Sequence, residues 1–223
     1  MQEDIERGLA FIKEKRFEEA AAAFNQAIEK EPDHPIGYTN FGNLLVGLHD
    51  PERAVPFFEK ALELDESYAA AYYGLGNAFF EMKRYDEAIS SFKRAESGGI
   101  TDSDIHYMLG MSYLHLDQQR MALVHFQRAT ELNEADTEAR FQYALCLAKL
   151  GQVDLAIEHF QRVTREAGNH ADSFYNLGVA YTFKEDYQTA RECFEKALDT
   201  EPQHLLAANG LKQLDKLENA GDA

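Results

Sequence analysis

The chain has 223 residues, 45% of them hydrophobic, which is enough to bury a substantial core in one or two domains. It carries 22 Lys and Arg against 39 Asp and Glu, a formal net charge of -17. Such a surface disfavours generic binding to nucleic acid or to anionic lipid. It suits basic or neutral partners, although acidic surfaces are also a common source of solubility.

The ends of the chain and its cysteines predict a cytoplasmic protein. The N-terminus, MQEDIERGLAFIKEKR, opens with acidic residues and lacks the continuous apolar segment of a secretory signal. No apolar run approaches the roughly 20 residues that span a bilayer. Cys146 and Cys193 are isolated and form no CxxC motif, which fits a reducing compartment, and we expect both to be buried thiols.

From the N-terminus onward, the same pattern of residues returns every 34 positions. A small residue is followed twelve positions later by alanine and four positions after that by phenylalanine. The small residues are Gly8, Gly42, Gly76, Gly110, Ala144 and Gly178; the alanines are Ala20, Ala54, Ala88, Ala122, Ala156 and Ala190; the phenylalanines are Phe24, Phe58, Phe92, Phe126, Phe160 and Phe194. This regularity predicts six contiguous motifs, 1–34, 35–68, 69–102, 103–136, 137–170 and 171–204.

Each motif predicts two helices, as the third copy illustrates. Tyr72, Leu75, Gly76 and Phe79 form one apolar stripe with helical spacing, and the pattern restarts at Ala88 to form a second. The small residues allow two helix backbones to approach closely. A single helix pair cannot bury its own stripe, so we expect neighbouring pairs to stack as a solenoid.

The ends of two motifs and of the chain carry further signals. Asp50-Pro51 predicts a helix start, and Gly98-Gly99 predicts a helix stop. After the sixth motif, residues 205–217 predict an additional helix with leucines on one side and charged residues on the other. We interpret 205–223 as a capping helix followed by a flexible tail at 218–223.

This pattern resembles the tetratricopeptide repeat (TPR) family, whose 34-residue signature comprises an aromatic residue, Leu-Gly, a second aromatic, Ala, Phe, Ala and Pro. The third copy matches it with Tyr72, Leu75, Gly76, Phe79, Ala88, Phe92 and Ala95, and Pro32 and Pro202 fill the last position elsewhere. The fourth position departs from the signature, with Asp4, His106 and Arg140. The chain is also similar to the small all-TPR proteins of Bacillus-type bacteria. The resemblance implies an all-α, right-handed superhelix whose concave face binds peptides.

No pattern of residues predicts catalysis, a metal or a cofactor. The carboxylate pairs Glu18-Glu19 and Asp86-Glu87 stand at predicted helix starts, where they complement the helix dipole. His125 and His159 occupy equivalent positions in successive motifs, about 10 Å or more apart, which is too far for a shared zinc ion. We therefore expect neither an enzyme nor a metalloprotein.

The first helix of each motif carries a second face that the packing signature does not use. Rings, apolar groups and amides stand there instead of charges, which favours a binding surface. The alternative is that close curvature buries these rings as a second core. The predicted peptide-binding residues are Thr39, Asn43, Tyr73, Asn77, Phe80, Tyr107, Met111, Phe141, Tyr175 and Phe183.

The polar residues on this face indicate what it binds. Asparagine can donate to and accept from a peptide backbone, and TPR domains commonly place one where Asn43 and Asn77 stand. The Lys and Arg residues with which one TPR subgroup clamps a chaperone's terminal carboxylate are missing. Asp104, Glu138 and Asp172 predict an acidic edge instead.

We therefore expect a monomeric, cytoplasmic adaptor for apolar-basic segments of other proteins, without affinity for nucleic acid or membranes. The alternative interpretation is a regulatory or assembly subunit that uses its convex or terminal surfaces.

Overall fold

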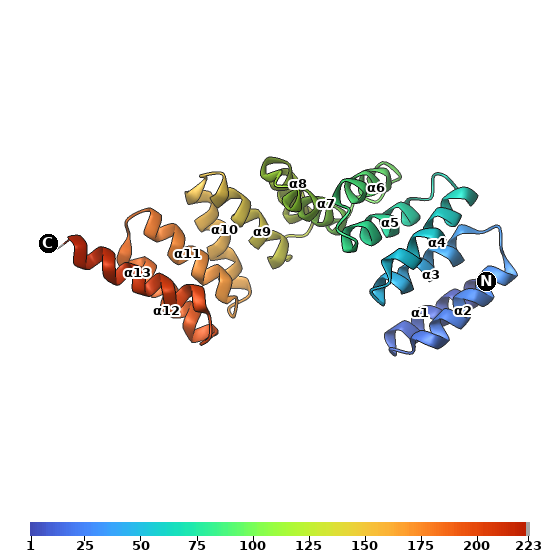
Figure 1. Ribbon diagram of the computed structural model, residues 1–223, viewed down its shortest axis with the longest axis horizontal. Coiled ribbons are helices and arrows are strands. Elements are labelled where there is room, and N and C mark those ends of the chain that lie inside the picture. The colour runs from blue at the N-terminus through green and yellow to red at the C-terminus, as the bar shows by residue number, and fades with distance from the viewer. Residues whose placement is uncertain (222–223) are drawn as a thin grey trace. The chain divides into compact units, whose positions relative to one another are not determined.

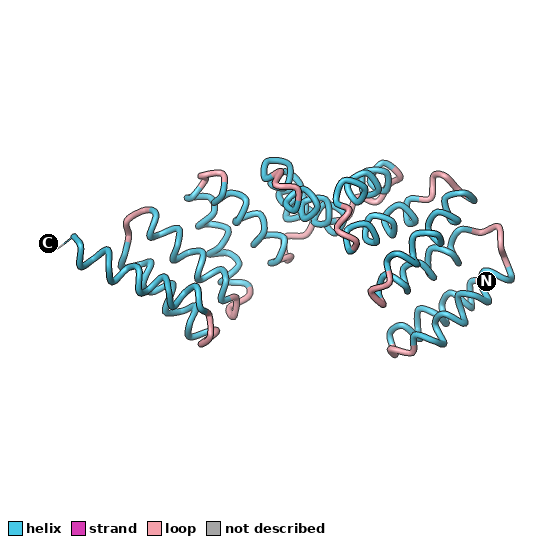
Figure 2. Tube along the Cα trace, viewed as in Figure 1, coloured by secondary structure: helices cyan, strands magenta, loops and turns pink. Residues whose placement is uncertain are grey.

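The structure, a computed structural model, describes the backbone of residues 1–221 and the side chains of residues 1–217. This part of the chain contains thirteen helices and no strand, which confirms the predicted all-α class (Figures 1 and 2). The chain divides into two compact units, Met1–Gln118 and Gln119–Ala223.

The first unit is a row of seven helices in which each helix packs against the next. The odd-numbered helices also contact one another in order, so together they form one side of the row. The helices are α1 (Gln2–Lys13), α2 (Phe17–Lys30), α3 (Pro35–Gly47), α4 (Pro51–Leu64), α5 (Ala69–Glu81), α6 (Tyr85–Ser97) and α7 (Ser103–His115).

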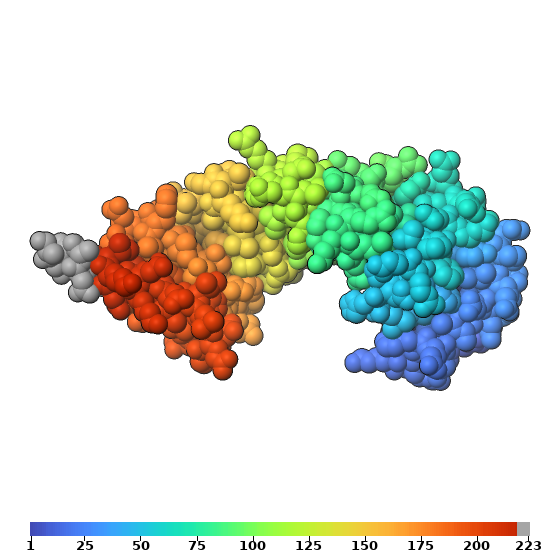
Figure 3. Space-filling view, in the orientation of Figure 1, coloured from blue at the N-terminus to red at the C-terminus, as the bar shows by residue number. Residues whose placement is uncertain are grey.

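The second unit contains six helices, and each packs against the next. They are α8 (Gln119–Leu132), α9 (Thr137–Lys149), α10 (Val153–Glu166), α11 (Ala171–Phe183), α12 (Tyr187–Thr200) and α13 (Leu205–Gly221). The last helix, red in Figure 3, packs against both α11 and α12. It continues through residues 218–221, where we expected the tail to begin, and residues 222–223 lie outside the described part.

Helix ends follow the local signals in the sequence. Pro51 occupies the first turn of α4, directly after Asp50. α6 ends at Ser97, and Gly99 adopts a φ of +103°, as the predicted glycine stop requires.

The turns inside the helix pairs share a feature that the sequence does not reveal. One residue in each has a left-handed backbone, and these residues also recur every 34 positions. They are Lys15, His49, Lys83, Asp117, Gly151 and Glu185. Only one is the glycine that such a conformation favours, so composition alone gives no signal.

The recurring phenylalanines form the centre of the core. Five of the six are 0% exposed and Phe194 is 2% exposed. A Cβ atom placed on Gly76 would lie 2.4 Å from Cε1 of Phe92, and one on Gly178 would lie 2.5 Å from Cε1 of Phe194. These distances are shorter than any ordinary carbon–carbon contact, so the ring rests directly on the backbone of the neighbouring helix.

In two motifs, a glycine of the next odd-numbered helix closes the other side of the ring. A Cβ on Gly74 would lie 2.2 Å from Cε1 of Phe58, and one on Gly210 would lie 2.7 Å from Cζ of Phe194. The same ring therefore joins helices within a motif and between successive motifs.

The polar residues at the fourth position of three motifs are buried and paired. Asp4 is 2% exposed and accepts a hydrogen bond from Lys30 Nζ at 2.7 Å. His106 lies 3.7 Å from a carboxylate oxygen of Glu96. These pairs replace the aromatic contact that the signature would place there.

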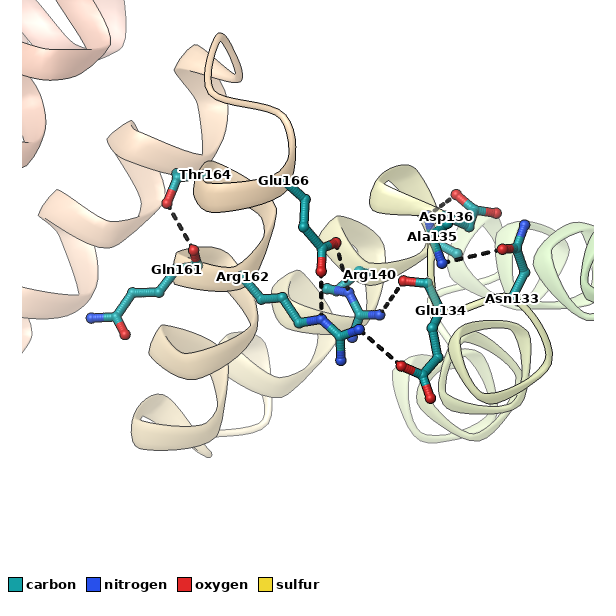
Figure 4. A network of polar contacts seen from close by, with 10 residues as sticks. Asn133, Glu134, Ala135, Asp136, Arg140, Gln161, Arg162, Thr164 and Glu166 are labelled. Atoms are coloured by element: carbon teal, nitrogen blue, oxygen red, sulfur yellow. Dashed lines mark hydrogen bonds and ion pairs between the residues drawn. The ribbon is translucent and has the colours of Figure 1, made fainter.

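Arg140 occupies the fourth position of the fifth motif and belongs to a larger polar network (Figure 4). Its Nη2 donates to the carbonyl oxygen of Glu134 at 2.6 Å, and its Nε lies 3.8 Å from Glu166 Oε2. Arg162 bonds the carboxylates of both Glu134 and Glu166, at 3.0 and 2.7 Å. The network thus links α9 and α10 to the loop that follows α8.

We predict that Gly76→Ala lowers the free energy of unfolding by about 1–3 kcal/mol, because the enclosed Phe92 ring cannot move away from the new methyl group. Gly47→Ala is the matched control, since a Cβ there meets no atom within 4 Å. We expect the control to be neutral or stabilising by about 0.4–1 kcal/mol. Urea unfolding of both variants measures the difference, and equal stabilities would contradict the helix pairing.

A second prediction concerns pH. The hydrogen bond from Lys30 holds the pKa of Asp4 below the ordinary aspartate value. The stability gained is complete above the unfolded-state pKa, about 3.9, and is lost as the pH falls through the lower folded-state pKa. We therefore expect Asp4→Asn to lose less stability than the unmodified protein when the pH falls from 6 to 3.

Urea unfolding at both pH values tests this prediction, with the exposed Glu3→Gln on the same helix as control. A pH profile of Asp4→Asn that matches the unmodified protein would show that the ion pair does not contribute.

Candidate functional site

The predicted peptide-binding residues all lie on odd-numbered helices, but they differ in exposure. We call the surface of these helices that faces away from their even-numbered partners the first-helix face. Asn43 and Phe183 are exposed; Tyr73, Asn77, Phe80, Tyr107, Met111 and Tyr175 are partly buried; Thr39 and Phe141 are buried.

The two buried residues correct the prediction that they present surface to a ligand. Thr39 is 3% exposed, and its hydroxyl donates to the carbonyl oxygen of Pro35, one turn earlier in α3. Phe141 is 8% exposed, with ring centroids of Phe160 and His170 at 5.8 and 4.6 Å. Phe141 belongs to the core of the second unit, and the Thr39 hydroxyl is used within its own helix.

In the first unit, α5 and α7 bring a phenol, an amide and a carboxylate into one neighbourhood. The rings of Tyr73 and Phe92 form a T-shaped contact, with centroids 5.7 Å apart. Burial raises the pKa of Tyr73, the charges of Asp104 and Asp102 raise it further, and a hydrogen bond from Asn77 opposes the shift. This part of the first-helix face therefore combines apolar surface, hydrogen-bonding capacity and negative potential.

Phe80 lies on the same helix, but neighbouring rings take up part of its surface. Its centroid lies 5.5 Å from Tyr85 and 5.6 Å from His115, and those two rings stack at 4.4 Å. The alternative interpretation of a second core thus describes Phe80 in part, while it does not describe the exposed Asn43.

The second unit contains a pocket between α11 and α13 that encloses about 410 Å³. Of the predicted residues, it includes Tyr175 and Phe183. Its complete lining is Tyr175, Val179, Thr182, Phe183, Phe194, Leu206, Asn209, Gly210 and Gln213.

Sequence reasoning assigned residues of α13 to a cap and missed their place in this pocket. The available signal was the 34-residue spacing. Leu206, Asn209 and Gln213 follow Asp172, Tyr175 and Val179 by one repeat length, so α13 supplies the same first-helix positions.

The predicted acidic residues divide between the two units. Asp104 belongs to the first unit, while Glu138 and Asp172 belong to the second, and all three are exposed. Glu138 accepts a hydrogen bond from Gln142 at 2.9 Å, and Asp172 is bonded to His204 at 3.1 Å. All three carboxylates lie in the first turn of an odd-numbered helix.

The carboxylates and thiols that could take part in catalysis or metal binding are in structural contacts or are buried. Among the described residues, no group of three His, Cys, Asp or Glu side chains is arranged to hold a metal. Glu19 and Glu87 accept hydrogen bonds from Arg16 and Arg84, one turn away. Cys146 and Cys193 are free and buried, and burial raises the pKa of each thiol to about 11, which suppresses the reactive thiolate at neutral pH.

No helix within the described residues is both long and apolar enough to span a membrane.

Sequence comparison agrees with the geometry. Models described as tetratricopeptide repeat match residues 5–34, 39–105, 103–136 and 137–209. No curated protein matches the chain significantly.

Solved structures extend the likeness to the whole fold. YrrB, described as a TPR protein with an unusual peptide-binding site, is 47% identical, with a TM-score of 0.80 over 86% of this chain and 99% of that chain. MamA is 25% identical, with a TM-score of 0.69 over 73% of this chain and 95% of its own.

PilF of Pseudomonas aeruginosa, at 20% identity, shares the fold, with a TM-score of 0.83 over 95% of this chain and 96% of that chain. The 34-residue pattern, the stacked helix pairs and the likeness to YrrB together show that this chain belongs to the tetratricopeptide repeat family.

Proposed function

We propose that the protein is an adaptor that binds an extended peptide segment of a partner protein on its first-helix face. The observation that carries this proposal is the composition of that face, where rings and amides remain partly exposed on helices whose other side is fully used in packing. TPR proteins are in general non-enzymatic protein-interaction modules. YrrB, the 47% identical relative, is itself described as having a peptide-binding site.

The amides supply the means of holding a peptide without reading its sequence. An asparagine side chain offers both a donor and an acceptor, which match the carbonyl and N–H groups of an extended main chain. Asn43 is exposed on α3, and Asn77 is partly exposed on α5. The neighbouring rings of Tyr73 and Tyr107 add apolar contact for side chains of the peptide.

Charge supports a partner segment with apolar and basic residues. Burial raises the pKa of Tyr73, the negative charges of Asp104 and Asp102 raise it further, and the whole chain carries a formal charge of -17. Basic side chains lower their energy in such a field, whereas acidic peptides are repelled. We further propose that the protein is a monomer and that it works in the cytoplasm.

A second candidate function is a regulatory or assembly subunit that uses a terminal surface. The observation in its favour is that the start of α13 exposes two adjacent leucines, Leu205 at 77% and Leu206 at 56%. Because a peptide-binding surface also exposes apolar side chains, measurements of peptide binding and of self-association are needed to separate the adaptor from the assembly subunit.

The test begins with linear peptides selected on the full chain from a random 12-residue library. We predict that Asn77→Ala weakens binding of a selected peptide by about 0.5–1.5 kcal/mol, because one hydrogen bond to the peptide backbone is lost. Fluorescence anisotropy measures the affinity, and circular dichroism checks that the helices are intact.

Asn25→Ala is the matched control, since Asn25 is an exposed asparagine on the even-numbered helix α2. A loss of binding confined to this control would move the site to the even-numbered helices. Failure to select any peptide would contradict the adaptor function.

A further inference from the structure

The pocket between α11 and α13 gathers apolar side chains that remain open. Val179, Phe183 and Leu206 are 44%, 76% and 56% exposed, and all three line it. Single exposed hydrophobic residues are ordinary on a protein surface, but three around one pocket indicate a binding site. The partly buried Tyr175 and the core ring of Phe194 complete the apolar lining.

Glycine at position 210 allows α13 to form the second wall. A Cβ there would lie 2.7 Å from Cζ of Phe194, so any larger residue would push the helix away from α12. The neighbouring Ala207 and Leu214 are both 0% exposed and anchor α13 in the core. The pocket is therefore part of the packed fold.

The start of α13 is also held against α11 by a buried histidine. The backbone N–H of Ala207 donates to His204 Nδ1 at 3.1 Å, so the imidazole proton is on Nε2. That nitrogen donates to Asp172 Oδ1, also at 3.1 Å. His204 is 7% exposed, and a preformed wall of this kind lowers the entropy lost on binding.

Two amides stand beside the apolar lining. Asn209 and Gln213 are exposed, and no hydrogen bond joins either side chain to another residue in the described part of the chain. By contrast, Asn176 on α11 donates to the carbonyl oxygen of Asp172 at 2.7 Å and is already used. Gln213 occupies the same repeat position as Asn43 and Asn77. The two open amides therefore match an extended main chain.

Charge distinguishes the α11 side of the pocket. Asp172 precedes the pocket residues of α11, Glu185 lies two residues after Phe183, and both carboxylates are exposed. The nearby Lys184 forms an ion pair with Asp154 and does not neutralise them. The α13 side carries the exposed Lys212 and Lys216, so only the α11 side favours a basic residue.

From these observations we infer that this pocket is the anchor site for one large aliphatic or aromatic side chain of an extended peptide, with a basic residue beside it along α11. Asn209 and Gln213 hold the peptide backbone while Val179, Phe183 and Leu206 enclose the apolar side chain. The inference rests on the proposed peptide-binding function and adds the position and chemistry of the anchor.

The chain offers a closely matched pair of variants for the test. Leu205 and Leu206 are adjacent, exposed leucines on α13, and only Leu206 lines the pocket. Peptides selected on the full chain from the random library should share one large apolar residue next to Lys or Arg. We expect Leu206→Ser to weaken their binding at least about tenfold, as removal of a buried leucine contact implies, and Leu205→Ser to leave it unchanged.

Two further measurements support the assignment independently of Leu206. Phe183→Ser changes a residue that is 76% exposed, so folding should survive while binding of the same peptides falls severalfold. Replacing the basic residue of a selected peptide by glutamate should weaken binding more strongly at low salt than at high salt. Thermal melts of all variants confirm that the fold is intact.

Equal affinities of Leu205→Ser and Leu206→Ser would overturn the anchor. So would a dimer, measured by analytical ultracentrifugation, that only Leu206→Ser disrupts, because a second copy would then fill the pocket. Loss of binding in Asn77→Ala with full binding in Leu206→Ser would overturn the anchor and retain the proposed function. Absence of any selected peptide would overturn both.

Discussion

The contact between a phenylalanine ring and a helix backbone without a Cβ is the constraint on which the rest of the structure depends. Phe92 lies so close to Gly76 that even one methyl group cannot be added without moving the ring, and the ring is fully buried. A contact this close sets the spacing of the helix pair more narrowly than ordinary packing of long side chains would. The same contact recurs at Gly8, Gly42 and Gly178, so these helix pairs take nearly the same shape.

One side of each odd-numbered helix is used to pack against its even-numbered partner, and this limits which residues the other side can present. The odd-numbered helices commit residues such as Leu75 and Gly76 to packing, and the first-helix face carries partly exposed rings and amides. Even that face is only partly free, because Thr39 and Phe141 are buried and the ring of Tyr73 packs against Phe92. The half-buried tyrosines thus contribute both to the core and to the exposed surface, so packing against the core orders the apolar part of this face.

Much of the fold could be predicted from the sequence because the packing rule is local and repeated. The spacing of Gly76, Ala88 and Phe92 is enough to predict a helix pair, and copies of it predict the stack. The burial of Phe141 could not be predicted in this way, since it depends on His170 at the end of the motif. The left-handed turn residue could not be recognised either, because five of its six positions hold non-glycine residues. Each failure concerns a property set by neighbours rather than by a residue's own position in the pattern.

In the last helix, one change in the repeat pattern removes the glycine that receives the phenylalanine ring. At the repeat position of Gly8 and Gly178, α13 carries Lys212, and a lysine there leaves no room for a phenylalanine ring against the helix. The same helix retains Gly210, Leu206 and Gln213 at positions that face α12 and α11. It can therefore close the core of the preceding pair while it presents no surface for another ring of this kind. Leu206, Asn209 and Gln213 of α13 keep the repeat positions of the first-helix face, so α13 forms one wall of the pocket although it lacks the glycine that receives a phenylalanine ring.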